Sequence, residues 1–171
     1  MEAPLILTLA LDPDSQAFFD GLRTRHFPPE RNFLPAHLTL FHALPGAHRA
    51  EIEALLRTTT TTQAEPLRLA VTGLLFFGQG VAYAVECPVL NTLHTALQRE
   101  CSARLALTPQ DQKGLNPHVT IQNKVAPATA RALFEERQAD FTPFAATGTG
   151  LQLWAYRGGP WEALSGWAFG G

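Results

Sequence analysis

Two short segments of the chain carry the same order of side chains: a histidine, an apolar residue, a threonine and a second apolar residue. They are His37-Leu38-Thr39-Leu40 and His118-Val119-Thr120-Ile121. The apolar and β-branched residues in and around each segment predict a short strand. Because side chains alternate between the two faces of a strand, each histidine shares a face with its threonine, while the apolar residues face a core.

This pairing of side chains suits chemistry at phosphorus. An in-line displacement needs a base on the attacking oxygen and an acid on the leaving oxygen, and histidine can serve in either role because it titrates near neutral pH. The hydroxyls of Thr39 and Thr120 can donate hydrogen bonds to the charged phosphoryl oxygens. A strained ester such as a nucleoside 2′,3′-cyclic phosphate needs no metal ion once its leaving oxygen is protonated. We therefore expect one site that uses both histidines.

The elements that must bring the two motifs together form a repeat. Hydrophobic periodicity predicts strands over 5–11, 36–43, 67–77, 81–87, 117–124, 144–156 and 161–169, and helices over 13–25, 49–57, 88–105 and 127–139. The threonine run 58–62 is predicted to be a polar loop, because β-branched residues disfavour a helix. The series strand, helix, motif strand, helix and hairpin occurs twice and shares the strand 81–87. This order predicts that residues 1–171 form a single two-lobed domain built from an internal, permuted duplication, in which both motifs face one cleft.

Composition limits the class of partner. The chain has 171 residues, of which 46% are hydrophobic and 16% charged, with a net charge of -2. This balance argues against a protein that clamps long nucleic acid through its phosphates, but it leaves room for a site that binds one terminal phosphate. The two cysteines, Cys87 and Cys101, lack metal-binding spacing. The first residues lack a basic targeting segment and no apolar run could span a membrane, so we expect a cytoplasmic protein.

The paired motifs resemble those of the two-histidine (2H) phosphoesterase superfamily, and within it the bacterial branch of 2′-5′ RNA ligases and cyclic phosphodiesterases. The resemblance covers essentially the whole chain. It implies an α+β fold with two pseudo-symmetric lobes, antiparallel sheets facing a central cleft and helices outside. It also implies metal-independent hydrolysis of 2′,3′-cyclic phosphates to 2′-phosphates, with no cofactor.

The resemblance further implies residue roles. His37 corresponds to the general acid and His118 to the general base, while Thr39 and Thr120 correspond to phosphate ligands. Many relatives carry a basic residue immediately before the second proline-histidine pair, where this chain has Asn116. Lys113 and Lys124 are candidates to replace it. The absence of a basic residue at Asn116 lowers the affinity that we expect for a long RNA more than it affects the reaction at phosphorus.

Weaker candidates surround the motifs. Lys124 falls on the His118 face by strand alternation and could contact a phosphate. Four aromatic residues could stack on a base, although core packing is the alternative for each. They are Phe41, Tyr83, Trp154 and Tyr156.

Other functions remain open. The same site could join RNA ends in a reversible 2′-5′ ligation, which the acidic net charge disfavours because ligation needs a large RNA footprint. A binding module could recognise a nucleotide or RNA end without turnover. A metallohydrolase could use the histidines at 37, 42, 94 and 118, but alternation places His42 on the opposite face from His37 and no carboxylate flanks them at ligand spacing. The partner we expect is a nucleotide or short RNA with a 2′,3′-cyclic phosphate end, bound by a monomer without metal or membrane.

Overall fold

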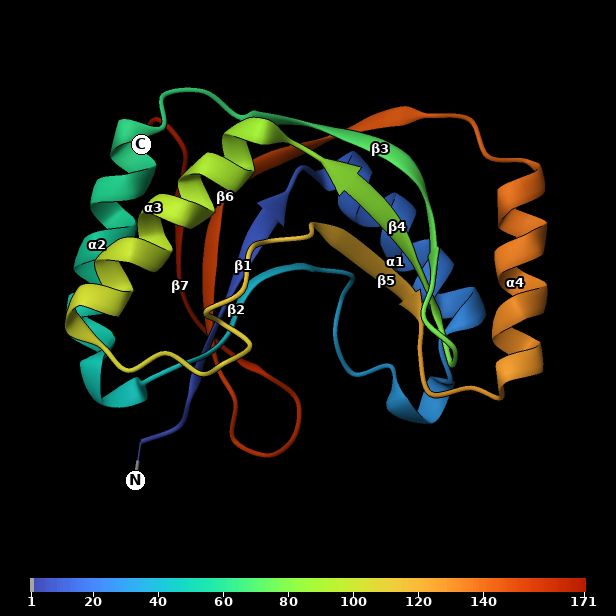
Figure 1. Ribbon diagram of the computed structural model, residues 1–171, viewed down its shortest axis with the longest axis horizontal. Helices are drawn as coiled ribbons and strands as arrows, with labels where there is room; N and C mark the ends of the chain where they lie inside the picture. Colours follow the sequence, from blue (N-terminus) through green and yellow to red (C-terminus); the bar gives the residue numbers. More distant parts are fainter. Residues whose placement is uncertain (1) are drawn as a thin grey trace.

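The computed structural model describes residues 2–171 and has an α+β fold (Figure 1). Its strands are β1 (Leu5–Leu11), β2 (Leu38–Leu44), β3 (Leu67–Phe76), β4 (Val81–Glu86), β5 (His118–Gln122), β6 (Phe144–Ala155) and β7 (Glu162–Ala168). Its α-helices are α1 (Pro13–His26), α2 (Arg49–Thr62), α3 (Pro88–Arg104) and α4 (Pro127–Ala139). The predicted α+β class and the predicted order of elements are confirmed.

The strands form one antiparallel sheet that is divided between two lobes by β6. The strand order is β2-β1-β6-β3-β4-β5, and β7 also pairs with β6. Residues 144–148 of β6 pair with β3, whereas residues 148–155 pair with β1. We call β2, β1, β7 and this later part of β6 the first lobe, and β5, β4, β3 and the earlier part the second lobe. The two sheets expected across a cleft are thus two halves of one continuous sheet.

The strands that carry the two motifs lie at opposite ends of this sheet. β2 ends the first lobe and β5 ends the second lobe. These two strands nevertheless lie against each other, so the sheet curls until its ends meet. The twist of antiparallel strands accumulates across a sheet and permits this curvature. Curling is what brings His37 and His118, far apart in sequence, to one place.

The helices are exchanged between the lobes. α1 connects β1 to β2 but packs on β5, in the second lobe, where α4 covers β3 and β4. α3 connects β4 to β5, yet it packs beside α2, which covers β6 and β7 of the first lobe (Figure 1). The order β1-α1-β2-α2 recurs as β4-α3-β5-α4, and the internal duplication stays a prediction. Within residues 2–171, none of the helices combines the length and apolar character needed to cross a bilayer.

The threonine run corrects the sequence prediction, because residues 58–62 are the last turn of α2 rather than a loop. The hydroxyls of Thr58, Thr59, Thr61 and Thr62 each donate to the carbonyl four residues earlier. These bonds satisfy the hydroxyls within the helix, so the preference of threonine for other conformations is offset.

Candidate active site

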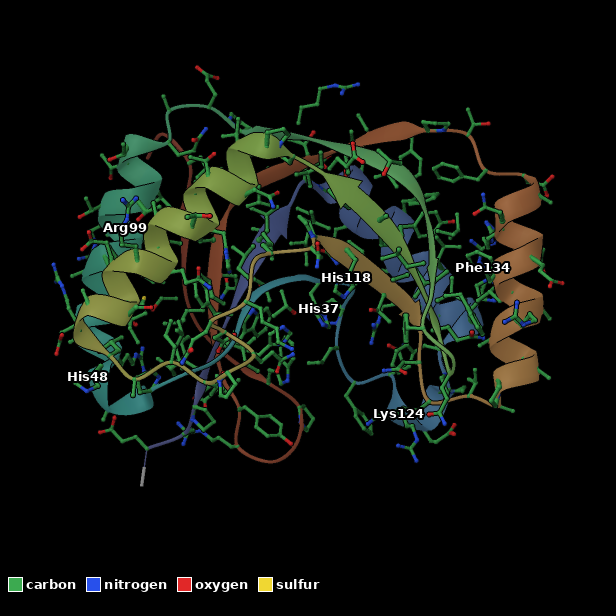
Figure 2. The ribbon with its side chains drawn as sticks, viewed as in Figure 1. His37, His48, Arg99, His118, Lys124 and Phe134 are labelled. Carbon is green, nitrogen blue, oxygen red and sulfur yellow. The ribbon has the colours of Figure 1, made fainter. Side chains whose placement is uncertain are left out.

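Each motif holds its histidine ring in the same way. The Nδ1 atom of His37 lies 2.8 Å from the carbonyl oxygen of Pro35, and Nδ1 of His118 lies 2.8 Å from the carbonyl oxygen of Asn116. A carbonyl can only accept a hydrogen bond, so each ring carries a proton on Nδ1 and its Nε2 can exchange a proton with a ligand. Figure 2 shows the two histidines side by side.

His37 is the more enclosed of the two rings. It is half-buried, whereas His118 is exposed. Burial lowers the pKa of His37 to about 4, against the opposing effect of the Pro35 carbonyl, and the positive charges of Arg23, His118 and His42 lower it further. The ring is therefore neutral at pH 7 in the ligand-free protein. A bound phosphate anion would favour the protonated form.

The two threonines lie beside the histidines as the alternation predicts. The residues between them, Leu38 and Val119, are 0% and 1% exposed and face the core. Thr39 and Thr120 are half-buried on the other face of the sheet, which we call the motif face. The hydrogen bonds of residues 2–171 leave both hydroxyls free to donate to a ligand.

A β-bulge in β2 corrects the prediction for the next two residues. Thr39 pairs with Thr8, but Phe41 pairs with the adjacent Leu7, so β2 has one residue more than its partner. Phe41 therefore turns into the core, where it is 1% exposed and stacks on His94 at 4.6 Å. His42 turns to the motif face, where it is exposed. Partial burial is the main cause that lowers the pKa of His42, and the charge of His118 lowers it further. Simple alternation predicts Phe41 on the face of His37 and His42 on the opposite face; both predictions are wrong, because an added residue inverts the alternation beyond it.

Asp111, in the loop before β5, binds β2 just beyond this bulge, at a second register shift between Phe41 and Leu44. Its carboxylate accepts hydrogen bonds from the backbone N–H groups of His42 (2.7 Å) and Ala43 (2.8 Å). The side chain is buried at 2% exposure. These bonds satisfy amides on the free edge of β2, so Asp111 sets the direction in which His42 points.

Arg23 of α1 is a buried cation that sequence reasoning missed. It is 4% exposed, its Nη1 atom donates to the carbonyl of Thr120 (3.1 Å) and its Nε donates to the side chain of Asn32 (3.2 Å). It forms no ion pair among residues 2–171. Its charge acts on His37 and is a candidate to replace the basic residue that is absent at Asn116. The one feature of the sequence that could have indicated this role is the position of Arg23, a cation on a helix otherwise predicted to cover the core.

The four predicted stacking residues lie in different surroundings. Tyr83 is 3% exposed and packs among aromatic rings under α1, so, like Phe41, its ring faces are covered and it does not fit a stacking role. Tyr156 is 44% exposed at the end of β6. Trp154 is half-buried and lines a cavity of about 200 Å³ beside His37. Trp161, which sequence reasoning did not single out, lines the same cavity, with its ring 4.7 Å from that of His37.

Lys124 lies away from the histidines. β5 ends at Gln122, which is buried, and the chain then turns at Lys124 with a φ of 61°. Figure 2 shows Lys124 at the opposite end of β5 from His118. The predicted alternation fails because a register shift between β4 and β5 adds a residue before Gln122.

The four histidines of the metallohydrolase alternative do not converge. His94 is buried, and its Nε2 atom lies 3.0 Å from the carbonyl oxygen of Leu40. Among residues 2–171, no group of three or more histidine, cysteine or carboxylate side chains is arranged to hold a metal ion.

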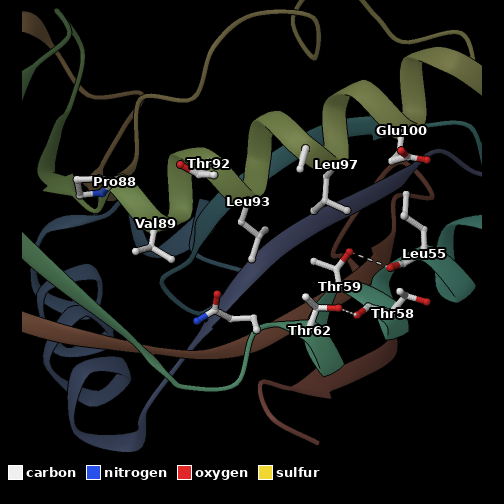
Figure 3. A pocket seen from close by; sticks show the side chains of 12 residues that line it. Leu55, Thr58, Thr59, Thr62, Pro88, Val89, Thr92, Leu93, Leu97 and Glu100 are labelled. Atoms are coloured by element: carbon white, nitrogen blue, oxygen red, sulfur yellow. Dashed lines mark hydrogen bonds between the residues drawn. The ribbon is translucent and has the colours of Figure 1, made fainter.

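A second cavity, of about 500 Å³, lies between α2 and α3 (Figure 3). Threonine and aliphatic side chains line it, and Glu100 is its one ionisable residue. The hydroxyls of Thr59 and Thr62 are engaged with helix carbonyls. It offers no acid and base pair, so the histidine pair remains the candidate active site.

Comparisons with known proteins agree with this geometry. A family model described as the 2′-5′ RNA ligase superfamily matches residues 11–160. No curated protein matches the chain.

Solved structures share the fold at low sequence identity. Protein TT0787 of Thermus thermophilus is 18% identical with a TM-score of 0.70, and the match covers 98% of each chain. E. coli LigT complexed with 3′-AMP is 20% identical with a TM-score of 0.60, over 99% of each chain. Kluyveromyces marxianus Usb1 is 15% identical with a TM-score of 0.50, over 95% of this chain and 97% of that one.

Proposed function

Since the chain belongs to the 2′-5′ RNA ligase superfamily, whose members are phosphoesterases or ligases, we propose that it hydrolyses 2′,3′-cyclic phosphates of nucleosides or short RNA ends to 2′-phosphates without a metal ion. The observation that carries this proposal is the matched pair of His37 and His118. Both rings are held at Nδ1 by a carbonyl, and both have Nε2 free.

The proposed reaction uses one ring on each side of phosphorus. Nε2 of His118 takes a proton from water while the water oxygen bonds to phosphorus. The bond from phosphorus to O3′ breaks, and O3′ takes a proton from Nε2 of His37. Thr39 and Thr120 donate hydrogen bonds to the phosphoryl oxygens, and the charge of Arg23 favours the anion. Exchange of one proton between the rings and solvent restores the starting state.

The acid role of His37 requires the substrate's charge. Because the pKa of His37 is about 4 in the empty site, the ring takes up its proton only when the phosphate anion lies beside it. The direction of transfer can be tested with a cyclic phosphate whose 3′ leaving atom is sulfur, since a thiolate leaves without an acid. His37→Ala should lose far less activity on this substrate than on the oxygen substrate, whereas His118→Ala should lose activity on both. The reverse pattern would exchange the two roles.

The first test is turnover of 2′,3′-cyclic AMP and its other-base analogues in excess chelator, followed by phosphorus NMR. We expect a 2′-monophosphate, and a loss of about 10³-fold in kcat in both His37→Ala and His118→Ala. His48→Ala is the matched control, because His48 is an exposed histidine far from the pair (Figure 2). Full activity in either variant of the pair would exclude the proposal.

Two alternatives use the same site. The family description favours 2′-5′ ligation, in which the 5′ hydroxyl of a second RNA replaces water. Formation of 2′-5′ linkages from RNA halves at a rate above hydrolysis would favour the ligase. Tight binding of a cyclic nucleotide with no product after long incubation would favour a binding module.

A further inference from the structure

The cavity of about 200 Å³ beside His37 opens on the motif face of the first lobe. Its floor is made by Thr8 and Ala10 of β1 and by Gln152 of β6, which pairs with Thr8. Gln16 of α1 and the loop before His37 complete its wall. A group bound in this cavity would lie next to a phosphate held at His37.

Two indole rings form an aromatic wall in this cavity. Trp161 lies 4.7 Å from His37 and 6.1 Å from Trp154, measured between ring centroids. The Nε1 atom of Trp154 donates to the hydroxyl of Thr8 (2.9 Å), which fixes this ring. Neither indole belongs to the hydrophobic core cluster, although Trp167 packs against it. These two half-buried rings therefore lie outside the core and line the cavity.

Two side-chain amides, those of Gln16 and Gln152, contribute hydrogen-bond acceptors to the cavity. The Nε2 atom of Gln16 donates to the carboxylate of Asp20 and to the carbonyl of Ala36. The Nε2 atom of Gln152 donates to the carbonyl of Leu153. Since all of these partners can only accept, the amide orientations are determined, and within residues 2–171 neither Oε1 atom has a hydrogen-bond partner.

We propose that this cavity binds the nucleobase of the substrate, that Trp161 stacks on the base, and that the free amide oxygens favour bases with an exocyclic amino group. The proposal rests on the proposed function in taking a nucleotide as the ligand. An aromatic face binds any base, whereas an amide oxygen gains a hydrogen bond from the amino group of cytosine or adenine and faces an oxygen in uracil. Trp161 is thus a base-binding residue, and Gln152 is a specificity-determining residue.

The stacking role is tested by comparing a nucleotide with a probe that lacks the base. Trp161→Ala should raise the KM for 2′,3′-cyclic AMP by about tenfold or more, and it should change the KM for 1-O-methylribose 2,3-cyclic phosphate far less. Trp161→Phe should retain most of the affinity. Phe77→Ala, an exposed aromatic between β3 and β4 and outside the cavity lining, is the matched control. An unchanged KM for cyclic AMP in Trp161→Ala, or an equal rise for both substrates, would overturn the stacking role.

The base preference is tested with 2′,3′-cyclic CMP and 2′,3′-cyclic UMP, which differ in the groups that face the amides. The wild-type protein should prefer the cytosine substrate in kcat/KM by about fivefold, and Gln152→Leu should reduce this preference. Equal use of both substrates, or a preference for uracil, would overturn the role of the amide oxygens.

A binding measurement separates this inference from the proposed function. Calorimetric titration with 2′-AMP reports the base site whether or not turnover occurs. Loss of 2′-AMP affinity in Trp161→Ala without turnover in the wild type would support the base site and reject the proposed reaction. Turnover with unchanged 2′-AMP affinity in Trp161→Ala would reject the base site alone.

Discussion

The two histidines are alike in how they are held and different in how they are surrounded. Each Nδ1 atom lies against the carbonyl two residues earlier, because both rings stand at the start of a motif strand. His37 is enclosed by Trp161 and lies near a buried guanidinium, whereas His118 is exposed. Similar local sequence therefore produces two rings in different surroundings, and the low pKa of His37 comes from burial by parts of the chain that are distant in sequence.

The titration of His37 follows from this environment. In ligand-free protein the ring should titrate near pH 4, as followed by the imidazole nitrogen shifts in NMR, and inorganic phosphate should raise its midpoint. Substitution of Trp161 by Ala should also raise the midpoint, because water would then reach the ring. A midpoint near 6.5 in the ligand-free protein would contradict the burial of His37.

Stability should respond to the same group. Between pH 6.5 and about 4 the unfolded chain binds a proton at His37 that the native chain does not, so native stability falls as the pH falls through this window. Above pH 6.5 both states are neutral and the contribution of His37 does not change. Urea denaturation gives the free energy of unfolding at pH 7 and at pH 4.5. The decrease between these two pH values should be smaller in His37→Asn than in the wild type by about 1–2 kcal/mol. An equal decrease in the free energy of unfolding in the wild type and in His37→Asn would contradict this prediction.

At the scale of an element, β2 depends on a loop that lies far along the chain. Its bulge turns Phe41 inward and His42 outward, and Asp111 satisfies the amides of His42 and Ala43 at the register shift that follows the bulge. An edge strand with unpaired amides is open to alternative pairing, so a buried carboxylate is a means of fixing one conformation. The geometry of the first motif therefore depends on the loop that leads into the second motif.

Asp111→Asn tests this dependence. The amide has one acceptor oxygen for two N–H donors and lacks the charge, so we expect a loss of about 1–3 kcal/mol in the free energy of unfolding. Asp140→Asn, at an exposed position after α4, is the matched control and should change stability little. Urea denaturation measures both variants. Equal stability of the two would show that the carboxylate is not needed at the bulge.

At the scale of the molecule, the lobes are interlocked. β6 contributes to both halves of the sheet, and α1 and α3 each pack away from the strands that they follow. Arg23 extends this exchange, since a side chain of α1 holds the carbonyl of Thr120 in β5. The two motif strands thus keep their relative position because each lobe contains parts from both halves of the chain.

Interlocking predicts that the lobes unfold together. Trp154 and Trp167 lie in strands of the first lobe and Trp161 in the loop between β6 and β7, so fluorescence reports that lobe, whereas circular dichroism reports the helices of both. The two urea transitions should coincide, with one midpoint. A separate transition seen by circular dichroism alone would show that the second lobe unfolds independently.

Sequence patterns were enough to predict the order of the elements, the pairing of His37 with Thr39 and of His118 with Thr120, and the burial of the residues between them. These features follow from composition and alternation along short stretches of chain. The tertiary structure decided the rest: the bulge at β2, the turn that removes Lys124, and the positions of Arg23 and Trp161. The bonds from Arg23 to Thr120 and from His42 to Asp111 join residues 97 and 69 positions apart. Alternation within a strand carries no information about the register of its partner or about a side chain that arrives from another element, so only the folded chain could reveal these features.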